Sequence, residues 1–278
     1  MTEAVHHGLA SAVAATRGRL TRWLLPSGVD AGAWFILVGR ALRGFCDGYI
    51  AVLLPAYLLA LGLTQWAVGL VSSATLIGSA LATILVGMLG SRFAPRRLLM
   101  LAAALMAATG VGFAGLSDLW PLLAIAFVGT LNPSSGDVSV FLPLEQARLA
   151  ESALPDARTA LFARYSLIGA FSAAIGALAA ALPGWLATHS GLSFLAAMRA
   201  MFFVYALIGV ALWVLYARLP LHQPQSGGAA TPLGPSRGIV IRLALLFSVD
   251  AFAGGLVVNA LLSLWLMQRF GLSPGAAG

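Results

Sequence analysis

The sequence contains no lysine and a single cysteine, Cys46, and charged residues make up only 9% of its 278 positions. One cysteine excludes an internal disulfide. A soluble domain has roughly 25% charged residues, so this chain has too few charges to cover a water-facing surface of its size. Hydrophobic residues make up 60% of the chain, and the two fractions together indicate an integral membrane protein surrounded by a lipid bilayer.

The sequence lacks the motifs that several kinds of chemistry require. There is no G-x-x-x-x-G-K-[ST] loop for ATP-driven transport and no G-x-S-x-G or H-E-x-x-H motif, so we expect no enzyme. The histidines His6, His7, His189 and His222 lie outside the apolar runs, and no Cys/His cluster has metal-ligand spacing. We therefore expect neither a cofactor nor a metal. The formal net charge of +7 does not indicate nucleic-acid binding, because the arginines lie at the ends of apolar runs.

Long apolar runs are the dominant feature of the chain. A membrane-spanning helix needs about 20 mostly apolar residues. Seven runs meet that length, and an eighth begins near Ser273; the seven are 33–61, 65–89, 97–116, 120–147, 159–187, 193–217 and 239–270. We therefore predict an all-α, polytopic membrane protein in which sequential helices are antiparallel neighbours.

Arginine is distributed unevenly between the two sides of the membrane. The segments on the side of the N-terminus hold Arg17, Arg19, Arg22, Arg92, Arg96, Arg97, Arg148, Arg158, Arg218, Arg237 and Arg242. The loops on the other side hold almost no arginine, apart from Arg269 near the last run. Because positive residues accumulate in cytoplasmic loops, we predict a multi-pass protein of a bacterial-type cytoplasmic (inner) membrane with a cytoplasmic N-terminus.

The chain contains two similar phrases about 200 residues apart. The first is LGLTQWAVG at 61–69 and the second is FGLSPGAAG at 270–278. Upstream of them lie RGFCDG at 43–48 and DAFAGG at 250–255, and the Pro/Gly/Ser-rich segment 218–238 between the halves reads as a flexible linker. Two similar halves in one membrane chain indicate a transporter built from repeats, with its substrate site between them.

The loop between the second and third runs carries the most specific motif, GMLGSRFAPRR at 87–97. It resembles the cytoplasmic signature of the major facilitator superfamily, G-x-x-x-D-R-x-G-R-R. The positions that belong to this gating motif are Gly87, Gly90, Arg92, Arg96 and Arg97. Ser91 stands where the family has its acidic residue, and Ala94 and Pro95 also depart from the pattern.

The resemblance implies a domain organisation and a function. After a cytoplasmic tail at 1–32 it implies a six-helix lobe at 33–217, a cytoplasmic linker at 218–238 and the start of a second lobe at 239–278. It also implies a secondary active transporter that moves a small solute by alternating access, coupled to protons or another ion. On this interpretation the second lobe is truncated and its missing part is needed for function. The alternative is a non-transporting membrane sensor or scaffold built on a carrier lobe.

The acidic residue of the family motif is missing here, and another carboxylate must replace it if the motif is to act as a clamp. In the family this residue clamps a neighbouring helix end and helps to hold the outward-open state. We expect Glu145 to supply the charge by pairing with Arg92, Arg158 or Arg164 at the inner rim. The alternative is that these residues are interfacial anchors that set the topology.

The first run carries Arg40, Arg43 and Asp47 within an arc of about 60° of a helix. A charge at the bilayer centre costs about 2.5–3.5 kcal/mol on insertion scales. We therefore expect these side chains to line a watery cavity on the substrate or proton pathway, the alternative being a structural ion pair between helices. Asp250 is the repeat partner of Arg43, and we expect it either to pair with Arg43 across the two lobes or to carry the coupling proton.

Two other runs contain polar or helix-breaking residues. The fourth contains NPSSGD at 132–137, which predicts a kink or a broken helix. Asp137 would then be a proton or substrate site, or the partner of Arg164. In the seventh run Gly254-Gly255 allow a bend that would turn Asn259 toward the cavity, where its amide could bind substrate.

The fifth run contains small residues at intervals of three to four, including Gly169, Ala173 and Gly176. Small residues at this spacing let the backbones of two helices approach closely in lipid. The pattern therefore predicts tight packing of this run against another helix and gives no information about substrate.

Overall fold

The computed structural model describes the chain apart from residues 1–24, 26, 31, 135–138, 221–236 and 256. The described residues form helices, and the only β pairing among them is an isolated bridge between Val29 and Ala153. The prediction of an all-α protein is therefore confirmed. Most of the predicted tail, most of the predicted linker and Asp137 lie outside the described residues.

The described residues form a series of helices. In chain order they are α2 (Ala33–Ala60), α3 (Gln65–Leu89), the 3-10 helix η1 (Gly90–Arg92), α4 (Pro95–Gly115), α5 (Leu119–Val128), α6 (Phe141–Ser152), α7 (Pro155–Ala179), α8 (Leu182–Ser190), α9 (Phe194–Ala217), α10 (Arg237–Gly255), α11 (Asn259–Phe270) and α12 (Pro274–Ala277). Within the described residues five stretches are long and apolar enough to cross a bilayer: α2, α3, α4, α7 together with α8, and α9. The chain is therefore a polytopic membrane protein.

Two of the expected continuous spans are each divided into two helices. The predicted span 120–147 is α5 followed by α6, and the predicted span 239–270 is α10 followed by α11. In the first, Gly129 ends α5 and Pro133 follows; proline has no backbone N–H to donate, and its ring disfavours a continued helix. In the second, the interruption follows Gly254-Gly255, where glycine disfavours a continued helix. For the fourth run the sequence predicted a kink or a broken helix, and the structure shows the break. For the seventh run it predicted a bend, and the structure shows a full interruption.

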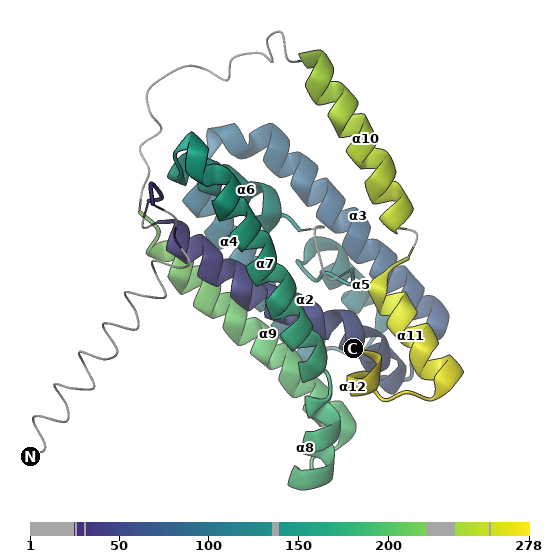
Figure 1. Ribbon diagram of the computed structural model, residues 1–278. Coiled ribbons are helices and arrows are strands. Elements are labelled where there is room, and N and C mark those ends of the chain that lie inside the picture. Colours follow the sequence, from purple (N-terminus) through teal and green to yellow (C-terminus); the bar gives the residue numbers. More distant parts are fainter. Residues whose placement is uncertain (1–24, 26, 31, 135–138, 221–236, 256) are drawn as a thin grey trace, which may run out of the picture.

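Helix α2 is the central element of the bundle and packs along the length of α7 (Figure 1). A Cβ atom added to Gly48 of α2 would overlap the carbonyl oxygen of Ala173, and one added to Gly176 of α7 would overlap that of Phe45. The expected tight packing of the fifth run is thus confirmed, with α2 as its partner. A second close pair is α4 with α9, while α3 packs against α5.

The two repeated phrases fold alike at the turns that separate successive spans. Gly62 after α2 has a φ of 83° and Gly271 after α11 has a φ of 66°, a left-handed conformation that favours glycine. Two residues later, Thr64 and Ser273 take the N-cap positions of α3 and α12. Sequence similarity between 61–69 and 270–278 therefore corresponds to the same helix–turn–helix chemistry.

The interior of the bundle is polar at defined points, and its five tyrosines are all buried: Tyr49, Tyr57, Tyr165, Tyr205 and Tyr216. Each hydroxyl donates a hydrogen bond to a backbone carbonyl or to a carboxylate, as a buried tyrosine requires. Large apolar side chains such as Trp66, Phe171 and Leu207 are exposed on the outer helices, where a bilayer would surround them.

Candidate functional site

The polar face of α2 is buried inside the bundle. Arg40, Arg43 and Asp47 are exposed by 8%, 2% and 7% respectively. They lie one turn apart along a helix whose other buried residues are mainly apolar. The three ionisable side chains thus point into the protein, away from the outer surface that carries the exposed apolar residues.

Glu145 of α6 is the centre of a buried hydrogen-bond network. Its carboxylate forms an ion pair with the guanidinium of Arg43, and both side chains are almost fully buried. The hydroxyl of Tyr165 donates to Oε2 of Glu145 at 2.6 Å, and that of Tyr216 donates to Oε1 at 2.5 Å. We call these four residues the Glu145 network. It connects α6 to α2, α7 and α9, because each donor belongs to a different helix.

This network corrects one expectation. Glu145 was expected to pair with Arg92, Arg158 or Arg164 at the inner rim, and the structure pairs it with Arg43 inside the bundle. The reason is geometric: α6 contacts α2 and α7, so the buried carboxylate of Glu145 meets α2 instead of the loops that carry the expected arginine partners. Tyr165 and Tyr216 were not among the predicted site residues. Their hydroxyl groups lie within apolar runs, and this was a signal that could have identified them.

Aromatic rings cover the two arginines of α2. The guanidinium of Arg43 lies over the ring of Phe141 at 4.5 Å, and that of Arg40 lies over the ring of Tyr165 at 5.0 Å. A desolvated cation over an aromatic face gains about 2 kcal/mol or more. The Nε atoms of both arginines are buried without a hydrogen-bond partner among the described residues. Both arginines therefore retain unused hydrogen-bonding capacity.

Asp47 differs from the other charges of this cluster. Within the described ranges its carboxylate forms no hydrogen bond and no ion pair, although Arg43 and Arg40 lie close enough to act on its charge. Arg43 and Asp47 therefore interact only electrostatically, since Arg43 takes Glu145 as its contact partner. A buried carboxylate without a contact partner is costly to retain, which points to a role other than stability.

The two helix interruptions meet next to this cluster. The side-chain amide of Asn259 donates to the carbonyl oxygen of Ser134 at 2.9 Å, and the backbone N–H of Ala260 donates to that of Pro133 at 3.0 Å. The first two residues of α11 are therefore bonded to the segment between α5 and α6. We call these four residues the joint.

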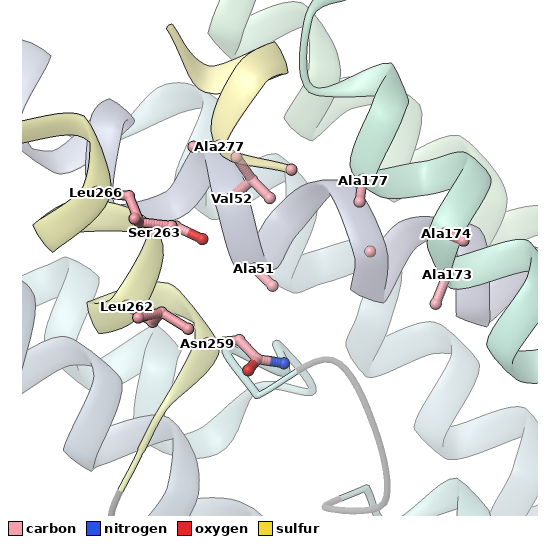
Figure 2. Close-up of a pocket in the computed structure, with 12 residues that line it drawn as sticks. Ala51, Val52, Ala173, Ala174, Ala177, Asn259, Leu262, Ser263, Leu266 and Ala277 are labelled. Atoms are coloured by element: carbon pink, nitrogen blue, oxygen red, sulfur yellow. The ribbon is translucent and has the colours of Figure 1, made fainter. Parts of the chain in front are cut away.

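A cavity of about 260 Å³ lies beside the joint, between α2, α7 and α11. Figure 2 shows Ala51 of α2, Ala173 of α7 and Asn259 and Ser263 of α11 around it. Small side chains line the α2 and α7 walls, and the polar groups come from α11. We call this cavity the pocket. Asn259 thus lines a cavity, as the sequence analysis expected for a residue that binds substrate.

The other two predicted pathway carboxylates lie elsewhere. Asp250 is exposed on α10, a helix that stands apart from the bundle (Figure 1), so the expected pair with Arg43 is not formed here. Asp137 lies outside the described residues, and its expected pairing with Arg164 cannot be followed. Arg164 is half-buried, and its Nη1 atom has no hydrogen-bond partner within the part of the chain that the structure describes.

The motif at residues 87–97 lies where α3 ends and α4 begins. Gly87 is in the last turn of α3, Gly90 starts η1, and Arg92 ends it. Arg92 and Arg97 are exposed, whereas Arg96 donates from Nη2 to the carbonyl oxygen of Ala217, the last residue of α9. A cation at a helix C-terminus also interacts favourably with the helix dipole. Arg96 therefore fastens the start of α4 to the end of α9.

A second set of contacts attaches the residues just before α2 to the rest of the bundle. The buried guanidinium of Arg148 approaches the carboxylates of Asp30 and Glu151, at 3.6 Å each. The backbone N–H of Asp30 donates a hydrogen bond to the carbonyl oxygen of Ser152 at 2.8 Å. The isolated bridge between Val29 and Ala153 lies beside it. The chain before α2 is thus attached to the connection between α6 and α7. Arg158 reinforces that connection through Nε, which donates to the carbonyl oxygen of Ala153 at 3.3 Å.

The described residues contain no group of three or more His, Cys, Asp or Glu side chains that could hold a metal ion. The chemistry that they do offer is the binding of charge and of hydrogen-bonding groups. Two arginines, each with an unpaired Nε atom, lie along α2 together with one carboxylate that has no hydrogen bond or ion pair within the described residues. An amide and a hydroxyl of α11 line the pocket. This arrangement can receive a solute or a proton without forming or breaking covalent bonds in it.

Comparisons with known proteins agree with this description. The family model of the Major Facilitator Superfamily matches residues 36–278. The chain is also similar to an uncharacterized membrane protein of Saccharomyces cerevisiae, with 28% identity over 167 residues. That match covers 59% of this chain and 37% of the yeast protein, so the chain spans well under half of its relative's length.

Proposed function

This chain belongs to the Major Facilitator Superfamily, a family of membrane transporters, and from that premise we propose that the whole protein is a secondary active carrier of a small solute. In this proposal the solute crosses by alternating access and its movement is coupled to protons or another ion. Residues 33–217 form the first lobe, and 239–278 begin the second. The N-terminus lies in the cytoplasm, and the membrane is the cytoplasmic membrane of a bacterial-type cell.

One observation carries the proposal: the buried carboxylate of Asp47 has no contact partner within the described residues. Natural proteins rarely keep such a group inside a membrane unless it has a function. Asp47 follows Arg43 by one turn and precedes Gly48, which lines the pocket. In this proposal Asp47, the sequence neighbour of Gly48, exchanges a proton with solvent or solute that enters the pocket.

The neighbouring residues take supporting roles in this proposal. Arg40 and Arg43 set the positive potential around Asp47, and Asn259 offers a hydrogen bond to the solute. Asp250 and Asp137 contribute further carboxylates to the pathway. The cytoplasmic residues Gly87, Gly90, Arg92, Arg96, Arg97, Arg158 and Arg164 hold the inner rim during the cycle.

The test uses the full-length protein reconstituted into liposomes that contain a pH-sensitive dye. A panel of sugars, amino acids, organic anions and organic cations is added outside, and a solute that is carried with protons changes the internal pH. Asp47→Asn should abolish the pH change while leaving exchange of radiolabelled solute across the membrane measurable. Asp118→Asn makes the same chemical change at an exposed N-cap and should behave as the unaltered protein.

Two results would contradict the proposal. If no solute of the panel crosses the membrane, the protein is better explained as the sensor or scaffold built on a carrier lobe. If solute and protons still move together in Asp47→Asn, coupling does not depend on this carboxylate. A carrier coupled to Na⁺ would give solute uptake that depends on the sodium gradient and is lost in the same variant.

A further inference from the structure

The interrupted fourth and seventh spans are bonded to each other at the points where each stops being helical. The segment that follows α5 presents the carbonyl oxygens of Pro133 and Ser134, and α11 presents the side chain of Asn259 and the N–H of Ala260. These groups are more than 120 residues apart in the sequence, as the separation of 125 between Ser134 and Asn259 shows. The contact therefore depends on how the two spans are placed and not on local folding.

One interruption supplies hydrogen-bond acceptors, and the other supplies the donors that they need. The first N–H groups of a helix have no partner within it, and this applies to Ala260 at the start of α11. The carbonyls of a segment that has left the helix also need donors, because lipid offers none. In the joint, Ala260 donates to Pro133 and Asn259 donates to Ser134. Separating the two spans would leave groups on both sides to be rehydrated.

The two sides of the joint are attached to the bundle by different kinds of contact. The Glu145 network fixes α6, which follows the fourth-span interruption, to α2, α7 and α9. Helix α11 contacts α2 but takes no part in that network, and α10 before it stands apart from the bundle. A movement of α11 against the bundle would therefore break the joint before it disturbed the Glu145 network.

We propose that Asn259 is a positioning residue that fastens the start of α11 onto the fourth-span interruption, and that this joint must open when α11 moves away from α2 and the pocket widens. The proposal deepens the carrier function proposed above and rests on it. Asn259 lines the pocket with the same side chain that reaches Ser134, so opening the pocket and opening the joint involve one group. The joint then contributes to the balance between closed and open pocket.

The first experiment measures the joint directly by hydrogen–deuterium exchange of full-length protein in lipid nanodiscs. Asn259→Leu keeps the size of the side chain and removes its donor, so the N–H of Ala260 should exchange about threefold to tenfold faster, as loss of one hydrogen bond allows. Asn259→Gln retains an amide and should restore part of the protection. Ser263→Ala, one turn on and lining the same pocket, should leave exchange at Ala260 unchanged.

The second experiment replaces the hydrogen bond with a covalent one. In a Cys46→Ala background, Ser134→Cys and Asn259→Cys are oxidised to a disulfide, and Ala51→Cys is added as a reporter. Ala51 lines the pocket and is only 3% exposed, so a water-soluble maleimide can react there only when the pocket opens. The disulfide should slow labelling at least tenfold relative to the protein that carries Ala51→Cys with Ser134 and Asn259 intact.

The outcomes separate this inference from the proposed function. Equal exchange at Ala260 in Asn259→Leu and the unaltered protein would show that Asn259 does not fasten α11. Equal labelling of Ala51→Cys with and without the disulfide would show that the pocket opens while the joint stays closed. Either result overturns the inference. Neither experiment requires a solute, so the liposome assay can fail while the joint is upheld, and the reverse also holds.

Discussion

Arg43 and Glu145 form an ion pair across 102 residues of sequence, with side chains exposed by only 3% and 0%. Two tyrosine hydroxyls donate further hydrogen bonds to the carboxylate, and the ring of Phe141 covers the guanidinium. Burying two charges costs several kcal/mol per ion, and only good geometry with additional hydrogen bonds compensates for it. The Glu145 network meets both conditions, so we expect it to be sensitive to the loss of any one partner.

Glu145→Gln should destabilise the protein strongly. The substitution keeps the size of the side chain but removes its charge, which leaves the guanidinium of Arg43 buried without a counter-ion. Breaking a buried pair in this way costs about 3–5 kcal/mol. Thermal unfolding of detergent-solubilised protein should show a clear fall in Tm. Glu151→Gln, at a half-exposed side chain, is the matched control and should change Tm little; equal shifts in the two variants would contradict the importance of burial.

Asp47→Asn should have the opposite effect on stability. Its carboxylate has no hydrogen bond or ion pair in the part of the chain that the structure describes, so replacement by a neutral amide removes a desolvation cost without breaking a contact. We expect Tm to stay the same or to rise. A fall comparable to that of Glu145→Gln would mean that Asp47 supports the fold, and its assignment to a proton pathway would lose its main argument.

Gly48→Ala should weaken the packing of α2 on α7. The added methyl group would overlap the backbone carbonyl of Ala173, and a backbone atom cannot move aside as the end of a flexible side chain can. Overpacking of this kind typically costs about 1–3 kcal/mol. Gly69→Ala makes the same change in α3, where an added Cβ has no neighbour within 4 Å, and should be neutral or slightly stabilising. Urea or thermal unfolding of both variants gives the comparison.

Arg96→Gln should loosen the end of α9. The guanidinium donates to the carbonyl oxygen of Ala217, which belongs to the last turn and has no partner within the helix. Losing this hydrogen bond and the positive charge at the helix C-terminus should cost about 0.3–1 kcal/mol of stability. Hydrogen–deuterium exchange should therefore accelerate in the last turn of α9 and stay unchanged in the middle of the helix. The exposed Arg97 provides the control, since Arg97→Gln should leave that turn protected.

Local features of the sequence predicted much of the fold. Length and hydropathy correctly identified five of the seven predicted spans within the described residues. Pro133 and its neighbours indicated the interruption in the fourth run, and the repeated phrases marked equivalent turns at Gly62 and Gly271. Small residues in α7 indicated a close helix neighbour. All of these features act over a few residues, and each has a structural consequence that does not depend on the rest of the chain.

Partner choice could not be predicted in the same way. The periodicity of α2 placed Arg40, Arg43 and Asp47 on one face, and all three are buried. The sequence nevertheless offered Asp47 and Asp250 as equally reasonable partners for Arg43, because it does not reveal which helix lies opposite. Only the packing of α6 against α2 brings Glu145 to Arg43. The joint between Ser134 and Asn259 depends on packing in the same way.

The interruption between α5 and α6 also determines where an inserted residue would be tolerated in this span. An extra residue between the end of α5 and Phe141 would lengthen the connection between the two helices and leave α6 as it is. An extra residue inside α6, between Phe141 and Glu145, would instead rotate the carboxylate by about 100° around the helix axis. Glu145 would then face away from both tyrosines and from Arg43. Length variation among natural versions of this span should accordingly be concentrated before Phe141.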